Sequence, residues 1–424
     1  MTEKLNYAII TDRQEECSQD NILFLSVHQI TKRKRGTIVM KRHNILLIAA
    51  LTAALCISGC GKQDEEASTE IQDITVEAED LPAAAEEEAP EPEEEVITDD
   101  EEAPGEGYVR SSLTNLWVKE EVANSRPIAV MMPTDSAAQP QYGIGSAGVL
   151  YEIMEEGSIS RQMAIIEGWQ DMEKIGNIRS VRHYYVPVGL EWDSIIVHFG
   201  GPYYADAWVT RSDVNNITGT HTGNTNVAPG SEAFFRSNDK KAPHNAYTSG
   251  EKLTSAIEKQ NYDKDHRSQY WTADHFTFTN ASNPNTLEDY SDAKRAVNID
   301  LSGVFPVTLT SLEYNEEEGV YYKTLHKNKQ IDQLTGEQLT FENVIVQMTD
   351  CKRLDDKDYQ DFTMIDSGKP GYFCTKGKMI PITWTKTSDY APTKYYDMDG
   401  KEIVLNTGKT YIAVAQSGTK PIFE

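Results

Sequence analysis

The first half of the chain beyond residue 110 contains short, continuous apolar runs. Residues 127–132, Pro-Ile-Ala-Val-Met-Met, form a run typical of a strand covered on both faces. Residues 149–154, 162–166 and 194–198 predict three more strands. Ser249 precedes apolar residues at helical spacing, which predicts a capped helix ending near Tyr262. Strands separated by helical segments favour an α/β domain, or an α+β one, with a mixed sheet over residues 113–285.

Beyond Asn298 one strand pattern follows another. The predicted strands cover residues 307–314, 320–325, 343–348, 379–386 and 411–415. Asp397-x-Asp399-Gly400 resembles the start of a calcium loop, but the twelfth residue is Gly408, where such a loop needs glutamate. We interpret this stretch as a hairpin turn. Residues 298–420 are therefore expected to form a smaller, β-rich C-terminal domain.

An export signal precedes these segments. Lys41 and Arg42 come before an apolar stretch at residues 45–55, and Ser58-Gly59 supply small residues directly before Cys60. This order predicts a lipoprotein signal peptide over residues 40–59 and acylation of the Cys60 thiol. The lipid would hold the protein at the extracytoplasmic face of the cell membrane. About 13 apolar residues fall short of the roughly 20 that a membrane-spanning helix needs.

Two further segments lie outside the expected domains. Residues 1–39 are too polar for the start of an exported protein, so we expect translation to begin at Met40 and residues 1–39 to be a spurious upstream extension. Residues 60–107 follow the signal peptide. After Cys60 they hold 20 acidic residues against one lysine, which predicts a disordered, extended linker.

The acidic linker accounts for much of the formal net charge of −27. From Gly107 onward there are 31 basic and 42 acidic residues, so 31 − 42 leaves this part at −11. A surface without a basic face gives no reason to expect nucleic-acid binding. Two of the five cysteines, Cys351 and Cys374, fall in this part. Outside the cytoplasm they can form a disulfide, and the alternative is two buried free thiols.

The chain lacks the common short motifs of enzyme chemistry. It contains no G-x-S-x-G nucleophile elbow, no G-x(4)-G-K-[ST] phosphate loop and no H-E-x-x-H zinc helix. Its seven histidines beyond residue 180 are scattered without metal-ligand helical spacing. We therefore expect no cofactor and no metal site, and a binding protein is favoured over an enzyme.

Three arginines stand close together in the sequence of the first domain. Arg161 begins a predicted strand, and Arg179-Ser180-Val181-Arg182 follows it. Arginine forks match phosphate or carboxylate oxygens, so Arg161, Arg179 and Arg182, with Ser180, are candidates for binding an anionic ligand. The alternative is internal pairing with acidic neighbours. Those neighbours are Glu152, Glu155, Glu156 and Glu167.

A second group of candidates surrounds the strand at residues 194–198. His198 ends this strand, and Gly200-Gly201 follow it. The two glycines are expected to expose backbone N–H groups in front of a helix near residues 203–208, where an anion can bind. His244 lies on a probable loop, between Pro243 and Asn245, and is a better candidate for function than His198. Either histidine is more often a hydrogen-bonded structural residue.

Several segments carry a family resemblance. They are Arg126-Pro127-Ile128-Ala129-Val130-Met131, Glu156-Gly157-x-x-x-Arg161, Ile178-Arg179-Ser180-x-Arg182, His198-Phe199-Gly200-Gly201 and Ala242-Pro243-His244-Asn245. Together they resemble the YerB-like family of bacterial lipoproteins, typical of Gram-positive cells. The resemblance implies an α/β N-terminal domain and a β-rich C-terminal domain. It implies no reaction, because the family is a domain of unknown function.

Two positions depart from the family pattern. Pro133-Thr134 stands where many members carry Asp-Asn, and Ser158 stands where a second glycine is usual. The first departure removes the expected acidic group from that strand end.

These observations leave two functional hypotheses. In the first, the protein is a membrane-anchored binding or adaptor module whose arginine-lined cleft recognises an anionic component of the cell envelope, or an envelope protein. In the second, the same cleft is catalytic and acts on a phosphorylated or glycan substrate. There the arginines neutralise a phosphoryl group while His198 or His244 moves a proton. The lack of a recognisable nucleophile favours the first hypothesis.

Overall fold

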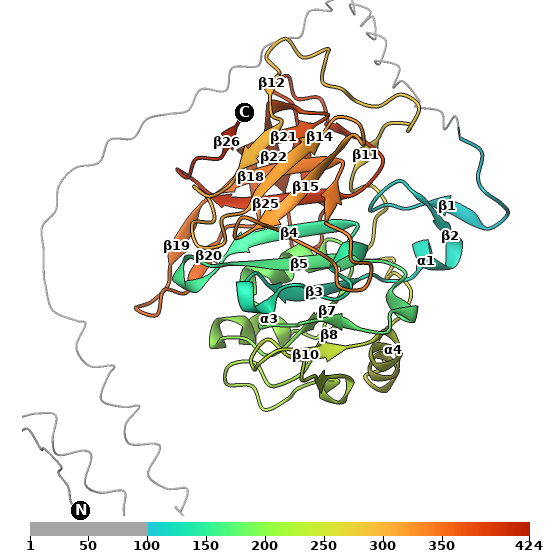
Figure 1. Cartoon of the computed structure of the whole chain (residues 1–424). Coiled ribbons are helices and arrows are strands. Elements are labelled where there is room, and N and C mark those ends of the chain that lie inside the picture. Colours follow the sequence, from blue (N-terminus) through green and yellow to red (C-terminus); the bar gives the residue numbers. More distant parts are fainter. Residues whose placement is uncertain (1–100) are drawn as a thin grey trace, which may run out of the picture. The chain divides into compact units, whose positions relative to one another are not determined.

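Strands far outnumber helices in the computed structural model, which describes residues 101–424 (Figure 1). The α-helices of this part are α1 (Glu120–Asn124), α2 (Val186–Leu190), α3 (Asp206–Val209) and α4 (Gly250–Lys259). The helix predicted after Ser249 is α4. Ser249 caps it as predicted, since its hydroxyl accepts a hydrogen bond from the Lys252 amide at 3.4 Å. Among the described residues, no helix combines the length and apolarity needed to traverse a lipid bilayer.

A mixed sheet of eleven strands runs through the centre of the molecule. In spatial order its strands are β12 (Lys294–Arg295), β22 (Lys378–Lys386), β21 (Asp366–Thr375), β18 (Asn343–Thr349), β25 (Thr410–Gln416), β4 (Val149–Met154), β5 (Ser160–Ile166), β3 (Ile128–Pro133), β7 (Ile195–His198) and β8 (Asn216–Thr218), with β23 (Lys394–Tyr396) beside β22. The strands predicted from apolar runs are therefore β3, β4, β5 and β7. Their continuous burial explains why they read as unbroken apolar segments.

This sheet takes strands from both regions in which separate domains were expected. β4, β5, β3, β7 and β8 come from residues 113–285, and the strands from β12 to β25 come from beyond residue 293. The two sets meet where β25 pairs in parallel with β4, with Tyr411 opposite Leu150 and Ala413 opposite Glu152. The last long strand of the chain, β25, thus pairs with one of the first, β4.

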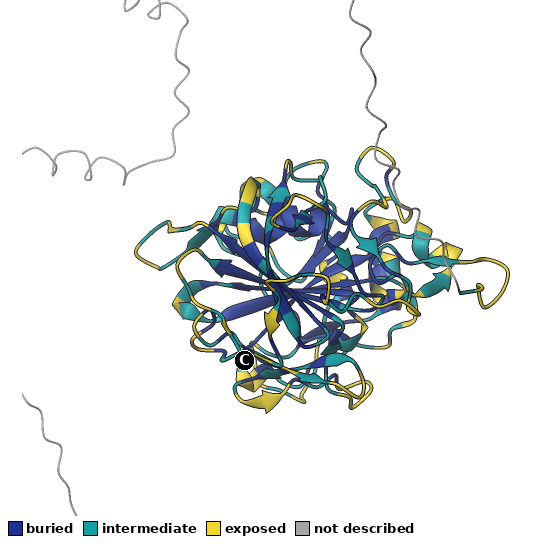
Figure 2. Ribbon diagram, turned by 90° about the horizontal axis from the view of Figure 1, so that it is seen from above, coloured by how far each residue is buried: buried dark blue, intermediate teal, exposed yellow. Residues whose placement is uncertain are grey.

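A second, six-stranded sheet covers one face of the central sheet. It contains β16 (Asn328–Lys329), β15 (Val320–Leu325), β14 (Ser311–Asn315), β13 (Asn298–Asp300) and β26 (Ile422–Phe423), with β17 (Thr340–Phe341) beside β15. Tyr321 and Phe341 from this sheet share one apolar cluster with Val344 and Val346 of β18. The other face buries a separate cluster that includes residues of α2. Figure 2 shows buried residues along the strands and exposed residues along the loops.

Short strand pairs complete the fold. They are β1 (Tyr108–Arg110) with β2 (Trp117–Lys119), β11 (Thr277–Phe278) with β24 (Val404–Leu405), β19 (Cys351–Arg353) with β20 (Gln360–Phe362), and the three-stranded set β6 (Ile175–Gly176), β10 (Ala246–Thr248) and β9 (Phe235–Arg236). The turn at Asp397–Gly400 is the predicted hairpin turn, since the Gly400 amide donates to the Asp397 carbonyl and Tyr396 pairs with Glu402.

A buried ion pair joins the two sheets. Glu152 of β4 and Lys323 of β15 are both fully buried, and their Oε2 and Nζ atoms lie 2.8 Å apart. The Glu152 carboxylate also accepts hydrogen bonds from the hydroxyls of Ser160 at 2.6 Å and Thr310 at 2.7 Å. Burial opposes ionisation, but Lys323 and these hydroxyls outweigh it and lower the pKa of Glu152. Glu152 is thus committed to the core and is no partner for the arginines.

Two expectations need correction. The described chain is richer in strands and poorer in helices than an α/β domain, so it is a sheet-rich fold. The strand predicted at residues 307–314 begins only at Ser311. Its first part is a turn whose Thr308 hydroxyl accepts a hydrogen bond from the Ser160 amide at 3.2 Å. The predicted extension 1–39, signal peptide 40–59 and Cys60 lie outside the described residues, as does most of the linker 60–107.

Candidate functional site

The parallel strands of the central sheet place several loops at one edge. β3, β7 and β8 are parallel to one another, and β4 runs the same way because both β4 and β3 are antiparallel to β5. The carboxyl ends of these strands therefore share an edge with the start of β5, where Arg161 lies. Ligand sites in open sheets form outside the carboxyl ends of parallel strands. We call this side of the sheet the carboxyl edge.

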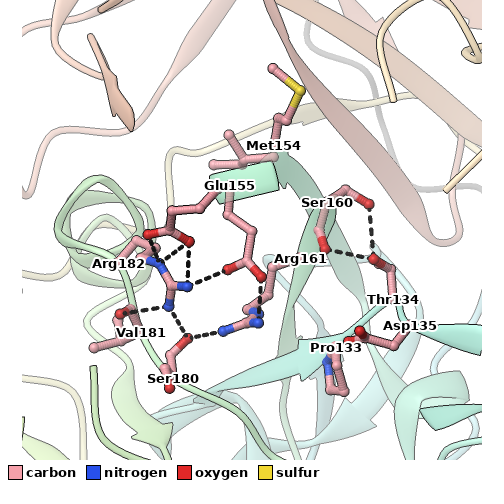
Figure 3. A network of polar contacts seen from close by, with 12 residues as sticks. Pro133, Thr134, Asp135, Met154, Glu155, Ser160, Arg161, Ser180, Val181 and Arg182 are labelled. Atoms are coloured by element: carbon pink, nitrogen blue, oxygen red, sulfur yellow. Dashed lines mark hydrogen bonds and ion pairs between the residues drawn. The ribbon is translucent and has the colours of Figure 1, made fainter. Parts of the chain in front are cut away.

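Arg161 and Arg182 form a closed network with two glutamates at the carboxyl edge (Figure 3). Arg161 donates to Glu155 Oε1 at 2.5 Å and to the Ser180 carbonyl at 2.7 Å. Arg182 pairs with Glu155 Oε2 at 2.9 Å and with Glu156 through two nitrogens, the shorter contact being 2.5 Å. The side chains of Arg161 and Glu155 are only 3% and 5% exposed. These ion pairs are the internal pairing with acidic neighbours that the sequence analysis gave as the alternative to ligand binding.

Burial works against the charges of this network, and it lowers the pKa of Arg161 despite the charge of Glu155. Burial raises the pKa of Glu155, and the charges of Arg161 and Arg182 act against that rise. Burial also disfavours the charge of Arg182, but Glu155 and Glu156 outweigh it and raise its pKa. Two guanidinium groups therefore share two carboxylates, and their local charge is balanced.

Arg179 differs from both of these arginines. Its backbone lies between strand ends, since its amide donates to the Met131 carbonyl and its carbonyl accepts from the Phe199 amide, both at 2.9 Å. Within residues 101–424 its guanidinium makes no hydrogen bond or ion pair, and one of its terminal nitrogens is buried without a partner. Arg179 nonetheless lies close enough to Arg161 and Glu155 to affect the pKa of each. It is the one arginine of the predicted three that remains free for a ligand in the described chain.

His244 lies beside Arg179 on the loop before β10. Its Nδ1 atom is buried, makes no hydrogen bond to any described residue and lies 4.0 Å from Oδ2 of Asp135. Asn177 fixes the loop by donating to the His244 carbonyl at 2.8 Å. Burial lowers the pKa of His244. Asp135 opposes this change, whereas the charges of Arg179, Arg161 and Lys240 add to it.

A surface cavity opens next to this histidine. Its volume is about 520 Å³. Polar and basic side chains line it, among them Ser136, Gln139, Tyr142, Lys240, Lys241 and His244. Another hollow of about 890 Å³ lies over β14 and β15, away from the arginines, and three glutamates line it. The lining of the smaller cavity has two lysines and one aspartate, Asp239, whose Oδ2 atom lies 3.8 Å from Lys240 Nζ. Asp135 and Arg179 are near His244 but are not among the lining residues. We take Arg179, His244 and Lys240, with Asp135, as the candidate site.

The predicted role of the glycine pair needs correction. The Gly200 amide donates to the Thr218 hydroxyl at 3.0 Å, so it is not available to an anion. The helix that follows, α3, has only four residues and offers little dipole. A Cβ atom on Gly200 would lie 2.8 Å from Thr220 Cγ2 and 3.1 Å from the His221 carbonyl oxygen. Gly200 therefore allows two strand ends to pack closely.

His198 is a structural residue by its geometry. It is fully buried, and its ring nitrogens contact the Gly200 carbonyl oxygen at 2.8 Å and Asn216 Oδ1 at 3.2 Å. Ser180 lies within the network, where its hydroxyl donates to the Phe199 carbonyl at 3.2 Å. Of the predicted candidates, Arg179 and His244 have unused polar atoms and no ion pair closer than 4.0 Å, whereas Arg161, whose Nε is also unused, is ion-paired with Glu155.

The two cysteines of the described chain are free thiols. Cys374 on β21 belongs to the apolar cluster under the second sheet, whereas Cys351 on β19 packs against the cluster on the opposite face. The central sheet separates the two sulfur atoms. Burial raises the pKa of Cys351 to about 11, which keeps its thiol protonated. Residues 101–424 also contain no group of three or more His, Cys, Asp or Glu side chains placed to hold a metal ion.

Sequence reasoning missed two members of the site. Asp135 lies directly after Pro133-Thr134, so the strand end does carry an acidic group, two residues later than the family pattern places it. Lys240 was missed because it lies more than 60 residues from Arg179 in the sequence. The proximity of Ala242-Pro243-His244 to Lys240 was the available signal.

The fold defines a sheet-rich protein in which two regions of the sequence contribute strands to one central sheet. Two family models match these regions. The N-terminal domain of a family described as protein of unknown function (DUF3048) matches residues 113–263, and the corresponding C-terminal domain matches residues 302–412. The chain belongs to this family, and the predicted resemblance is confirmed.

Two comparisons with single proteins agree with this assignment. The chain is 26% identical over 312 residues to "Putative lipoprotein YerB" of Bacillus subtilis (strain 168), covering 72% of this chain and 86% of that protein. The crystal structure of YerB protein from Bacillus subtilis is similar with a TM-score of 0.60 at 24% identity, covering 72% of this chain and 96% of that one. The structural likeness supports the fold.

Proposed function

We propose that the protein is a lipid-anchored binding module of the cell envelope, and that Arg179 holds an anionic group of its ligand. The anchor would be Cys60, as the signal sequence predicts and as the name of the Bacillus subtilis relative supports. The acidic linker would hold the sheet-rich part away from the anionic membrane surface. Envelope molecules with phosphate or carboxylate groups, or an envelope protein, are the partners in reach of such an anchor.

The unpartnered guanidinium of Arg179 is the observation that carries the proposal. A buried nitrogen of a charged group normally has a partner, because desolvation without one costs free energy. The guanidinium groups of Arg161 and Arg182 are both ion-paired with glutamates, although Arg161 Nε itself makes no hydrogen bond. The guanidinium of Arg179 has neither an ion pair nor a hydrogen bond to any described residue. A phosphate or carboxylate oxygen would supply this partner.

Thermal unfolding of the full chain in detergent, with and without ligand, tests the proposal. Pyrophosphate, a polyol phosphate polymer and an acidic peptide represent the envelope anions. A ligand at a hundred times its Kd stabilises the folded state by about 2.7 kcal/mol, which is a shift of a few degrees in Tm. Arg179→Ala should abolish the shift. The matched control is Arg295→Ala, because Arg295 is an exposed arginine at the far end of the sheet.

Two results would contradict the proposal that Arg179 binds an anion. If no anion raises the Tm of the wild type, or if Arg179→Ala responds like wild type, the Arg179 site is not the binding site. Arg179→Lys refines a positive result, since lysine keeps the charge but loses the planar fork. A fork-shaped contact predicts a weaker shift in this variant.

The contact between Asp135 and His244 favours hydrolysis as a second candidate function. A histidine whose pKa is lowered is neutral near pH 7 and can take a proton from water, and Asp135 Oδ2, 4.0 Å from its Nδ1, would stabilise the protonated ring. Arg179 would then stabilise charge on a phosphoryl group. Release of inorganic phosphate from bound phosphoesters, lost in His244→Gln but with binding retained, would establish this function. Binding without turnover would leave the protein a binding module.

A further inference from the structure

Three tyrosine rings gather on the surface at another point of the carboxyl edge. Tyr203 and Tyr204 follow β7, and Tyr359 lies in the hairpin of β19 and β20. The ring centroids are 4.1 Å apart for Tyr203 and Tyr204, 5.3 Å for Tyr204 and Tyr359, and 6.2 Å for Tyr203 and Tyr359. We call this group the tyrosine platform.

The sheet topology explains why these segments meet. β18 is parallel to β25, and β25 is parallel to β4, so β18 ends at the same edge as β7. The hairpin of β19 and β20, which follows β18, therefore lies beside the turn at Tyr203–Ala205, which follows β7. Its acidic residues fix it there. Asp361 Oδ1 lies 2.9 Å from His183 Nε2, and Asp358 Oδ2 accepts from the Gly157 amide at 3.2 Å.

Tyr203 is the exposed member of the platform, and Tyr204 and Tyr359 are half-buried. Tyr184, Tyr185 and Trp192 are at most 2% exposed and belong to the core. Tyr203 is 43% exposed, a large fraction for a ring that already stacks on a neighbour. An exposed ring of this kind offers a flat, electron-rich face that the fold itself does not use.

A fixed carboxylate lies at the rim of the platform. Asp355 Oδ2 accepts hydrogen bonds from the hydroxyls of Tyr203 at 3.3 Å and Tyr204 at 3.2 Å. Asp355 Oδ1 accepts from the Lys357 amide at 2.9 Å. These bonds hold the carboxylate in one orientation beside the rings. The edge of the arginine network is also close, because Arg182 and Glu156 both influence the pKa of Tyr359.

This combination matches the chemistry of a sugar ring. A pyranose has C–H groups on one face, which pack on an aromatic ring, and hydroxyls on its rim, which donate to a carboxylate. A peptide strand would instead need unpaired backbone groups, and a lipid surface would disfavour the acidic residues of the hairpin. We propose that Tyr203, Tyr204 and Tyr359, with Asp355, form a carbohydrate-binding surface for a pyranose glycan. The proposal goes beyond the anion site and does not depend on it.

Calorimetric titration of the full chain with a neutral oligosaccharide tests the proposal. The probe is the β-1,4-linked tetramer of N-acetylglucosamine, which carries no charge and cannot occupy an anion site. Saturable binding to wild type is expected, with affinity at least about tenfold lower in Tyr203→Ser. Tyr203→Phe keeps the ring and should retain most of the affinity. The matched control is Tyr108→Ser, because Tyr108 is an exposed tyrosine on β1.

Two further variants separate the possible failures. Asp358→Ala removes the hydrogen bond that holds the hairpin of β19 and β20 to Gly157, so it should weaken binding of the tetramer, because Tyr359 and Asp355 lie on this hairpin. Arg179→Ala removes the anion site and should bind the tetramer like wild type. The proposal is overturned if wild type does not bind the tetramer, if Tyr203→Ser binds as tightly as wild type, or if Arg179→Ala loses as much affinity as Tyr203→Ser. None of these results affects anion binding by Arg179.

Discussion

Two groups of basic residues lie close together at the carboxyl edge, and their surroundings differ. Arg161 and Arg182 share Glu155 and Glu156, so their charges are balanced and their side chains are almost fully covered. Arg179 has an unused guanidinium, and its neighbours His244 and Lys240 line a surface cavity. Arginines that look equivalent in the sequence are therefore divided into a closed, structural group and an open group. Charge balance decides which of them can serve a ligand.

Removal of a carboxylate from the closed group should have the largest effect. Glu155→Gln leaves Arg161 buried without a counter-ion, because Glu156 contacts only Arg182. We expect the free energy of unfolding to fall by about 3–5 kcal/mol. Urea denaturation of the variant and of the exposed control Glu313→Gln measures this change. A loss below about 1 kcal/mol would show that the network is not a structural element.

The next largest effect is expected from acid, which should lower the free energy of unfolding through the buried side chain of His275. His275 is stacked between Trp192 and Trp271, and burial lowers its pKa from 6.5 to about 4. The unfolded chain therefore takes up a proton as the pH falls below about 6.5, while the folded chain does so only near pH 4. Stability is fully present above pH 6.5 and declines by about 3 kcal/mol toward pH 4.

The measurement is the unfolding free energy against pH for wild type and His275→Phe. Phenylalanine keeps the stack and cannot titrate, so its curve should be flatter between pH 6.5 and 4. Parallel curves for the two proteins would contradict the assignment.

A glycine substitution separates packing from binding. Gly200 has a φ of +68°, and its amide is bonded to Thr218. Gly200→Ala should lower the free energy of unfolding by about 1–2 kcal/mol, because an L side chain is strained at positive φ. Anion binding by the folded variant should be unchanged, since Gly200 takes no part in the open group. Weaker pyrophosphate binding without loss of stability would instead restore a ligand role for this glycine.

The strands and the arginines were predictable to different extents. Residues 128–133 read as a strand because both faces are buried, which is a local property of the sequence. The pairing of β25 with β4 joins residues about 260 positions apart, and no local pattern encodes it. The Thr308 and Thr310 side chains turn toward Ser160 and Glu152, so a stretch that reads as strand begins as a turn.

The candidate site shows the same limit. The sequence placed acidic residues near the arginines, and Glu155 and Glu156 are indeed the partners. The sequence did not show that Lys323 forms an ion pair with Glu152, or that the Ser111 hydroxyl donates a hydrogen bond to Glu167 at 2.5 Å. Both contacts depend on the tertiary fold. Those distant contacts decide which carboxylates remain for the arginines, and hence that Arg179 has none.

Removal of Arg179 should have the smallest effect on stability. Its guanidinium has no partner among residues 101–424, so Arg179→Ala should change the free energy of unfolding by no more than about 0.5 kcal/mol. The same variant should raise the pKa of His244, because the charge of Arg179 helps to lower it. NMR titration of the His244 ring measures the pKa. A strongly destabilised variant would place Arg179 in the closed group.

The most direct test of the account observes the three arginines in one experiment. The Nε–Hε resonances of Arg161, Arg179 and Arg182 are followed by NMR while pyrophosphate is added, with Arg179→Lys used for assignment. The account predicts a saturable shift of the Arg179 resonance, with those of Arg161 and Arg182 nearly unmoved. A stationary Arg179 resonance, or equal shifts of all three, would contradict the division into a closed and an open group.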